Sequence, residues 1–172
     1  MTGAQGAALM EMVSRLNDSR FRKKDPKGDH SGAKKRVTAF KKAKARYLKL
    51  ISDDAAAFQR ISAAYKKGKD NSLYQSSLVK GYSVPLEMAE LAIGTMRLGL
   101  EERSRTSKWL YSDLVEAGIL LDAAYGAARL NVEINLKELS DRMTADRVTA
   151  KLDELESESN RLKNELKYSI SQ

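Results

Sequence analysis

A helical pattern between residues 33 and 67 constrains this chain more than any other feature. From about Ala33 to Lys67, apolar side chains recur at spacings of three and four residues, as on one face of an α-helix. Gly68, followed by Asp70 and Asn71, supplies a stop signal. No strand pattern competes with this helix or with the helical stretches around it. The sequence therefore predicts an all-α fold.

Four more helical stretches complete the expected fold. They cover about residues 3–16, 72–102, 110–139 and 145–169, and turn-forming residues predict a loop over 17–32. Pro85 falls inside the third helix of the chain, where proline removes a hydrogen bond, so we expect a kink or break near Tyr82 and Ser83. The pattern predicts a bundle of about five to six helices, one long and one kinked at the proline, in a single domain over residues 1–172.

Several classes of site are excluded by composition. The chain has no cysteine, which removes disulfides and thiolate chemistry and favours a cytoplasmic location. No apolar run approaches the roughly 18 residues that span a bilayer. The one histidine, His30, lies in a polar loop, so neither a metal cluster nor a catalytic triad is expected. Carboxylate, lysine and amide groups remain as the available chemistry.

Positive charge is concentrated near the start of the chain. The net charge is +8, from 31 basic and 23 acidic residues, and residues 20–49 carry thirteen Lys and Arg against Asp25 and Asp29. A solvated loop and helix face would explain this run. An alternative function is a non-enzymatic basic module that binds nucleic acid or an acidic partner through it. Aromatic residues are sparse there, so a stacking platform for single strands is not indicated.

Two amides lie four residues apart in the fourth helix. Asn131 and Asn135 project from one helix face, although Asn is a poor helix former. Leu130 and Ile134 are expected to face the core from neighbouring stripes. Amides beside a packed face need partners, which a neighbouring helix, water or a polar heterocyclic ligand would supply.

Two adjacent aspartates interrupt the long helix. Residues at consecutive helical positions point about 100° apart, so only one of Asp53 and Asp54 can face inward fully. Asp54 is four residues from both Leu50 and Phe58, on an apolar stripe. Burial there would raise its pKa toward the range that suits general acid or base catalysis. Two ordinary surface aspartates are the alternative.

Further polar candidates lie near helix ends. Lys66, Lys67 and Lys69 follow the aspartates at the end of the long helix, where they would neutralise an anionic substrate or favour the helix C-terminus. Ser112 and Asp113 open the fourth helix and would either cap it or contact a substrate.

Taken together, these segments resemble the cyclodeaminase/cyclohydrolase family. This family comprises the cyclodeaminase part of formiminotransferase-cyclodeaminase and stand-alone relatives that include methenyltetrahydrofolate cyclohydrolases. Five short matches occur in the family's order and cover nearly the whole chain: Asp54–Phe58 for D-A-x-A-F, Ala63–Lys66 with Lys69, Ser83–Leu86, Ser112–Leu114 and Asn131–Leu136.

The resemblance implies an all-helical homodimer with a folate site at or near the subunit interface. It implies closure of 5-formimidoyltetrahydrofolate to 5,10-methenyltetrahydrofolate with release of ammonia, or hydrolysis of the methenyl form. Beyond the tetrahydrofolate substrate, neither reaction needs a metal or an organic cofactor. Asp54 would be the general acid/base, and Asp53 would keep its pKa high by like-charge proximity.

The same resemblance assigns binding roles. Lys66 or Lys69 would hold a folate carboxylate, Ser112 and Asp113 would contact the substrate, and Asn131 and Asn135 would bond the pterin or the one-carbon group. The family's Glu within D-A-E-A-F is Ala56 here, and this sequence begins after the position of a P-G-G-G-S segment that contributes to the folate site in the family.

Two stripes are candidates for a dimer interface. Small residues cluster over 118–128, and leucines recur over 152–166 at coiled-coil-like spacing. Either stripe would give a symmetric dimer an apolar face to bury, and the leucines could instead pack on their own bundle. Pairing of dimers into a tetramer stays open.

Overall fold

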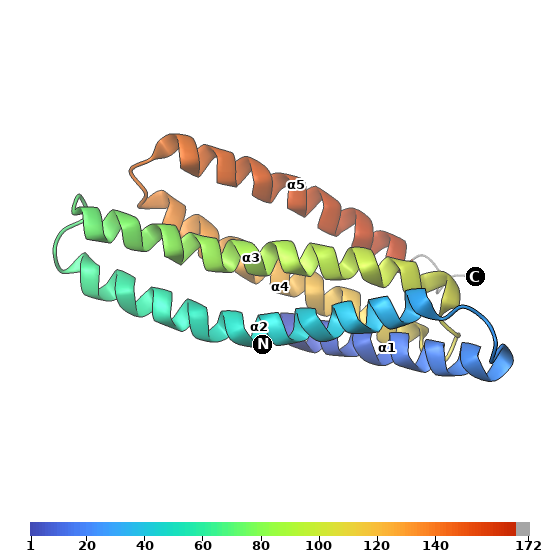
Figure 1. Ribbon diagram of the computed structural model, residues 1–172. Coiled ribbons are helices and arrows are strands. Elements are labelled where there is room, and N and C mark those ends of the chain that lie inside the picture. Colours follow the sequence, from blue (N-terminus) through green and yellow to red (C-terminus); the bar gives the residue numbers. More distant parts are fainter. Residues whose placement is uncertain (168–172) are drawn as a thin grey trace.

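The fold, a computed structural model that describes residues 1–167, is an all-α bundle, as predicted (Figure 1). The described residues contain no strand. The predicted end of the last helix, residues 168 and 169, lies outside them. The elements are α1 (Thr2–Lys24), α2 (Ser31–Tyr65), α3 (Ser72–Glu102), the short 3-10 helix η1 (Arg103–Arg105), α4 (Tyr111–Lys137) and α5 (Arg142–Lys167).

Helix α1 covers only part of the length of α2. It packs between α2 and α4, and it begins opposite the middle of α2, where Gly3 lies against the ring of Tyr47. Gly6 likewise lies against Leu121, and a Cβ atom at either glycine would collide with these side chains. In Figure 1 the N-terminus accordingly lies midway along the bundle. The second halves of α2 and α4 therefore extend past the start of α1.

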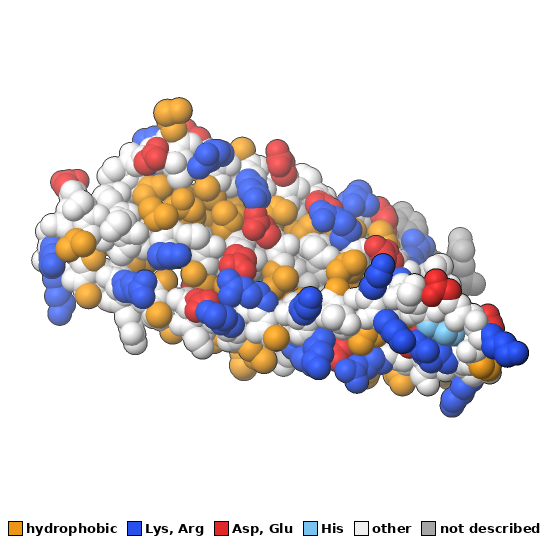
Figure 2. Space-filling view, in the orientation of Figure 1, with side chains coloured by type: hydrophobic (Ala, Val, Ile, Leu, Met, Phe, Trp, Pro, Cys, Tyr) orange, Lys and Arg blue, Asp and Glu red, His pale blue; other side chains and the backbone are white. Residues whose placement is uncertain are grey.

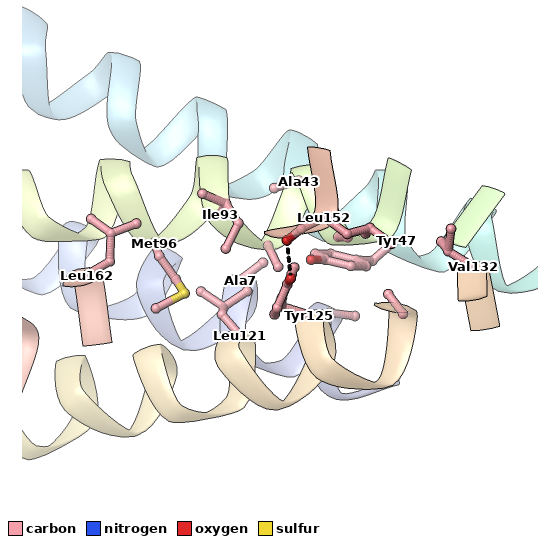
Figure 3. Close-up of a cluster of buried hydrophobic side chains, with 14 of the residues drawn as sticks. Ala7, Ala43, Tyr47, Ile93, Met96, Leu121, Tyr125, Val132, Leu152 and Leu162 are labelled. Atoms are coloured by element: carbon pink, nitrogen blue, oxygen red, sulfur yellow. Dashed lines mark hydrogen bonds between the residues drawn. The ribbon is translucent and has the colours of Figure 1, made fainter. Parts of the chain in front are cut away.

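The core fills the space between the helices with large apolar side chains. Met10, Leu121 and Leu152 are fully shielded from solvent, and Tyr125 donates its hydroxyl to the Leu152 carbonyl oxygen at 2.6 Å (Figure 3). Leu130 and Ile134, expected near the core, are instead about two-thirds exposed. Phe58 on the long helix is also exposed. These three side chains follow the helical period but lie beyond the part of the bundle that α1 covers.

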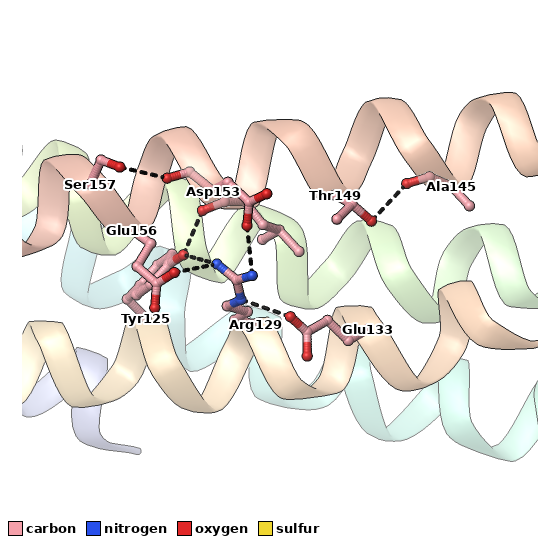
Figure 4. Close-up of polar contacts among 9 residues, drawn as sticks. Tyr125, Arg129, Glu133, Ala145, Thr149, Asp153, Glu156 and Ser157 are labelled. Atoms are coloured by element: carbon pink, nitrogen blue, oxygen red, sulfur yellow. Dashed lines mark hydrogen bonds and ion pairs between the residues drawn. The ribbon is translucent and has the colours of Figure 1, made fainter.

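Helix α5 is held on the bundle by its leucines and by one arginine. Leu152, Leu162 and Leu166 are buried against the same chain. Arg129 of α4 pairs with three carboxylates, two of them on α5 (Figure 4): Glu133 at 2.7 Å, Asp153 at 2.7 Å and Glu156 at 2.8 Å. The leucine stripe over 152–166 therefore packs on its own bundle, which was one of its two expected uses.

A buried glutamate joins three helices at one end of the bundle. Glu102 is 1% exposed and accepts hydrogen bonds from Ser14 at 2.7 Å, Asn17 at 3.1 Å and Arg36 at 2.5 Å. Burial raises the pKa of this carboxyl, but the three hydrogen bonds outweigh burial and hold its pKa below the usual value. The ion pair and hydrogen bonds thus fix α1 against α2 and α3.

The same contacts explain why the predicted loop over 17–32 was too long. Helix α1 continues to Lys24, so the connection covers only residues 25–30. Asn17 donates to Glu102 and to Thr106 Oγ1, and Asp18 pairs with Arg22 one turn later at 2.8 Å. Because these side chains are occupied elsewhere, they do not compete for the backbone groups that keep the helix intact.

Pro85 does not break α3. The helix is continuous from Ser72 to Glu102, so the predicted break is wrong, and the predicted kink stays a prediction. Proline lacks the N–H that would bond the carbonyl of Gly81, four residues earlier. Asn135 of α4 donates its side-chain N–H to this Gly81 oxygen at 3.1 Å. A neighbouring helix thereby replaces the hydrogen bond that Pro85 removes.

We expect Glu102→Gln to lower the free energy of unfolding by about 3 kcal/mol at neutral pH, because it leaves the Arg36 guanidinium without its buried charge partner. The folded-state pKa of Glu102 lies below 4.5, so its stabilising contribution is present above that pH and is lost as the pH falls further. The difference between the two proteins should therefore shrink in acid. Urea unfolding of both proteins at several pH values measures this difference in the free energy of unfolding.

Glu101→Gln is the matched control, since Glu101 is largely exposed and lies 3.8 Å from the same arginine. This substitution should lower the free energy of unfolding by less than about 1 kcal/mol. Equal losses at the two positions would contradict a special role for Glu102.

We expect Asn135→Ala to cost about 1 kcal/mol, because it leaves the Gly81 carbonyl without a partner. The cost should fall in a Pro85→Ala background, where residue 85 regains an N–H for that carbonyl. A double-mutant cycle in urea measures the coupling between the two positions. Strict additivity would show that Asn135 does not compensate for Pro85.

Candidate functional site

A cleft of about 270 Å³ opens where α1 begins. Its walls come from the first residues of α1 and from α2, α3 and α4, so residues far apart in the sequence meet there. It is lined by Met1, Thr2, Gly3, Tyr47, Ile51, Asp54, Met88, Ala124, Ala127, Ala128 and Asn131. Most of this lining is apolar or small, with one carboxylate and one amide. Such a composition suits a small organic ligand held by a few polar contacts.

Asp54 is the titratable carboxylate of this cleft. It is half-buried, and within residues 1–167 it has neither an ion pair nor a hydrogen bond. Burial raises the pKa of its carboxyl, because water stabilises the carboxylate less well there. Among the described carboxylates that are at least partly shielded, Asp113 alone shares this lack of a partner. Asp54 is therefore free to exchange a proton with a ligand.

Asp53 lies on a different side of α2. It pairs with Lys49 at 2.8 Å and with Arg46 at 3.6 Å. The hydrogen bond from Lys49 lowers the pKa of Asp53, so it stays ionised at neutral pH. The raised pKa of Asp54 comes from burial, and this placement gives no support to the predicted like-charge effect of Asp53.

Tyr47 is a cleft residue that the sequence identified only as core. Its ring is buried under Gly3, and its hydroxyl donates to the Met88 carbonyl oxygen at 3.1 Å. Burial raises the pKa of the phenol, which keeps it neutral. Tyr47 precedes Asp54 by seven residues, two helical turns, and this spacing could have placed both on one face.

The two asparagines of α4 have different surroundings. Asn131 lines the cleft, and its side chain has no hydrogen bond within the described part of the chain. Asn135 donates to Gly81 O and to the Asn131 carbonyl oxygen at 2.8 Å. Asn135 therefore has its partner on a neighbouring helix, which was one of the expected alternatives. The side-chain amide of Asn131 stays available for a ligand.

The remaining predicted residues lie outside this cleft. Lys66 ends α2 and is exposed, and Lys69 pairs with Glu138 at 2.6 Å. Ser112 and Asp113 lie in the first turn of α4, about 27 Å along the helix axis from Asn131. The N-cap of α4 is Leu110, so neither residue caps it, and Asp113 is placed to interact with the helix dipole.

Much of the basic run is engaged inside the molecule. Five of its cations pair with carboxylates of the same chain: Arg22 with Asp18, Arg36 with Glu102, Lys44 with Glu11, Arg46 with Glu87 and Lys49 with Asp53. Other Lys and Arg side chains gather at the end of the bundle that holds the histidine (Figure 2). Five of the thirteen cations of this run are thus engaged by carboxylates of the same chain, which weakens the nucleic-acid alternative.

Residues 1–167 contain neither a metal-binding cluster nor a membrane-spanning helix. No group of three or more His, Cys, Asp or Glu side chains is arranged to hold a metal ion. No helix is both long enough and apolar enough to cross a membrane.

Comparisons with known proteins agree with the fold. The family described as formiminotransferase-cyclodeaminase matches residues 1–154. Formimidoyltransferase-cyclodeaminase from Sus scrofa is 30% identical over 151 residues, which is 81% of this chain but 27% of that protein. This chain thus spans about a quarter of that relative's length.

A solved structure is also similar. Formiminotetrahydrofolate cyclodeaminase from Thermotoga maritima superposes with a TM-score of 0.85 at 26% identity, covering 97% of this chain and 82% of that one. The family match covers most of the chain, and the bundle is shared along nearly its whole length. The chain therefore belongs to the formiminotransferase-cyclodeaminase family.

Proposed function

We propose that this protein is a cyclodeaminase of folate one-carbon metabolism, acting on 5-formimidoyltetrahydrofolate. The observation that carries the proposal is the half-buried, unpaired Asp54 beside the free amide of Asn131, in a cleft of a chain from this family. Both relatives described above are named for cyclodeaminase activity. Hydrolysis of 5,10-methenyltetrahydrofolate, the other reaction expected from the sequence, is tested in the same assay.

In the proposed reaction, N10 of tetrahydrofolate attacks the formimidoyl carbon on N5. The new N10–carbon bond forms, and the bond from that carbon to the terminal nitrogen breaks. This nitrogen enters as the NH2+ of the protonated formimidoyl group, gains one proton and leaves as ammonia, so the positive charge passes to the methenyl product. Asp54, whose pKa is raised by burial, would donate that proton from its acid form, and its carboxylate then accepts the proton that N10 loses. Asn131 would bond the pterin or the one-carbon group.

The other predicted residues have secondary roles in this proposal. Asn135 supports the site by holding α3 beside α4 and by bonding the Asn131 carbonyl oxygen. Lys66, which is free of ion pairs in the described residues, remains the better candidate of the two lysines for a folate carboxylate, because Lys69 is paired with Glu138. No cofactor besides the folate substrate is part of the proposal.

We expect Asp54→Asn to lower kcat on 5-formimidoyltetrahydrofolate by about 10²- to 10⁴-fold, with folate affinity changed much less, because the substitution keeps size and removes the transferable proton. Wild-type activity should fall as the pH rises through the raised pKa of Asp54, since the acid form is then lost. This limb of the pH profile should be absent in the variant. Stopped-flow absorbance of the methenyl product measures kcat and its pH dependence for the two proteins.

Asp53→Asn separates the two carboxylates. Its loss should be much smaller, because Asp53 is ion-paired on another side of α2. If Asp53→Asn lowered kcat as much as Asp54→Asn does, the like-charge role predicted for Asp53 would be supported. If Asp54→Asn turned over at a near-normal rate, the catalytic role would move to Asp113. If the protein left both 5-formimidoyltetrahydrofolate and 5,10-methenyltetrahydrofolate reacting at their uncatalysed rates, the enzyme proposal would be refuted.

The protein is further proposed to be a homodimer. The stripe of small residues over 118–128 is only partly covered within the chain, because Gly118 and Ala128 are buried whereas Ala123 and Ala127 are exposed. Larger exposed apolar side chains also flank the cleft: Ile51 and Phe58 on α2, Leu130 and Ile134 on α4. A second copy covering this face would close the side of the cleft that α1 leaves open.

We expect light scattering to give twice 19.2 kDa for the wild type. Leu130→Glu combined with Ile134→Glu should yield monomers with reduced turnover, because charges would be buried in an obligate interface of more than roughly 2,000 Å². Met143→Glu, at a similarly exposed apolar residue of α5, should remain dimeric. A monomeric wild type would refute the dimer.

A further inference from the structure

A second hollow region lies between α2 and α3, on the side of α2 to which Asp53 projects. It consists of two adjoining hollows of about 320 and 390 Å³, and Arg60 and Lys80 line both. None of the residues that line the Asp54 cleft takes part in it. The two regions are therefore separate features of the surface.

The first hollow contains two ion pairs. Arg46 forms two hydrogen bonds to Glu87, at 2.5 and 2.6 Å, and Lys49 pairs with Asp53 at 2.8 Å. Each carboxylate in the lining thus has a cation within the same hollow. An incoming anion would have to compete with these pairs for Arg46 and Lys49. The cations of this hollow without a carboxylate partner in the described residues are Arg60 and Lys80, which also line the second hollow.

The second hollow has cations without carboxylates. It is lined by Arg60, Ala63, Ala64, Lys67, Leu73, Ser76, Ser77 and Lys80. Arg60, Lys67 and Lys80 form no ion pair or hydrogen bond with any described residue, although Lys80 is near enough to Asp53 to help lower its pKa. Three cations around one hollow create a positive potential that attracts anions.

The uncharged residues of the second hollow indicate which kind of anion would fit there. Ala63, Ala64 and Leu73 provide an apolar floor. The hydroxyls of Ser76 and Ser77 donate to carbonyl oxygens of their own helix, at 3.1 and 2.7 Å, so they are not free donors. Recognition would thus rest on the cations at the rim and on apolar contact below them.

We infer that this α2–α3 groove binds a small anion whose carboxylate or phosphate groups meet Arg60 and Lys80 and whose apolar body rests on the alanines. Two sources supply this chemistry. One is the glutamyl end of the tetrahydrofolate substrate, a reading that rests on the proposed function. The other is a separate small anion, for which the groove would be an independent site.

The test compares two doubly substituted proteins that lose the same charge. Arg60→Gln with Lys80→Gln removes the groove cations, and Lys41→Gln with Lys42→Gln removes two exposed cations from the first half of α2. All four side chains are exposed, so both proteins should fold. Calorimetry on the full chain measures affinity for tetrahydrofolate, tetrahydropteroate (which lacks the glutamate), citrate and inorganic phosphate.

We expect the groove variant to bind at least one anionic probe about tenfold more weakly, as for loss of charged hydrogen bonds, and the control to differ less than about twofold. A loss for tetrahydrofolate but not for tetrahydropteroate identifies the substrate's glutamate. A loss for citrate or phosphate alone identifies a separate anion.

Equal losses in the two variants, or no binding that depends on Arg60 and Lys80, would overturn the inference. Failure of the proposed function gives a different result, because the wild type would then bind neither tetrahydropteroate nor tetrahydrofolate while the citrate and phosphate measurements still report on the groove.

Discussion

The buried carboxylate of Glu102 determines where the cleft can form. By accepting hydrogen bonds from Ser14, Asn17 and Arg36, it fixes the C-terminal half of α1 against α2 and α3. From Ser14 back to Thr2, α1 extends about 18 Å toward the middle of the bundle. Its first turn consequently lies at Tyr47, where the absence of a side chain at Gly3 permits contact. The first residues of α1 therefore line the cleft together with residues of α2, α3 and α4.

The helices could be predicted because their signals are local. Apolar spacing located every long helix, and the glycine with its following Asp and Asn marked the end of α2. Errors arose where a distant partner decided the outcome. Asn17 and Asp18 look like loop residues until Glu102 and Arg22 engage them, and Pro85 looks like a helix breaker until Asn135 bonds the carbonyl of Gly81. Glu102 lies 85 residues from Asn17 and Asn135 lies 54 residues from Gly81, so sequence spacing cannot identify these two partners.

Only part of the site could be predicted, because local helix geometry decides some of its features and distant contacts decide the others. Helical geometry requires Asp53 and Asp54 to diverge, and the apolar stripe indicated that Asp54 would be the buried one. That stripe could not show that Lys49 would pair with Asp53, or that α1 would leave the Asn131 side of α4 open. Ser112 and Asp113 match a family motif, yet an axial rise of about 1.5 Å per residue carries them far from Asn131.

The unpaired Asp54 has a consequence for stability as well as chemistry. Its pKa is raised in the folded state, so the ionised form is stabilised less there than in the unfolded chain. This penalty is absent at pH values below the usual 3.8 and grows as the pH rises through the raised pKa. A neutral amide at this position avoids the penalty while filling the same space. The carboxyl is thus best explained by its capacity to transfer a proton, since the fold would be at least as stable without its charge.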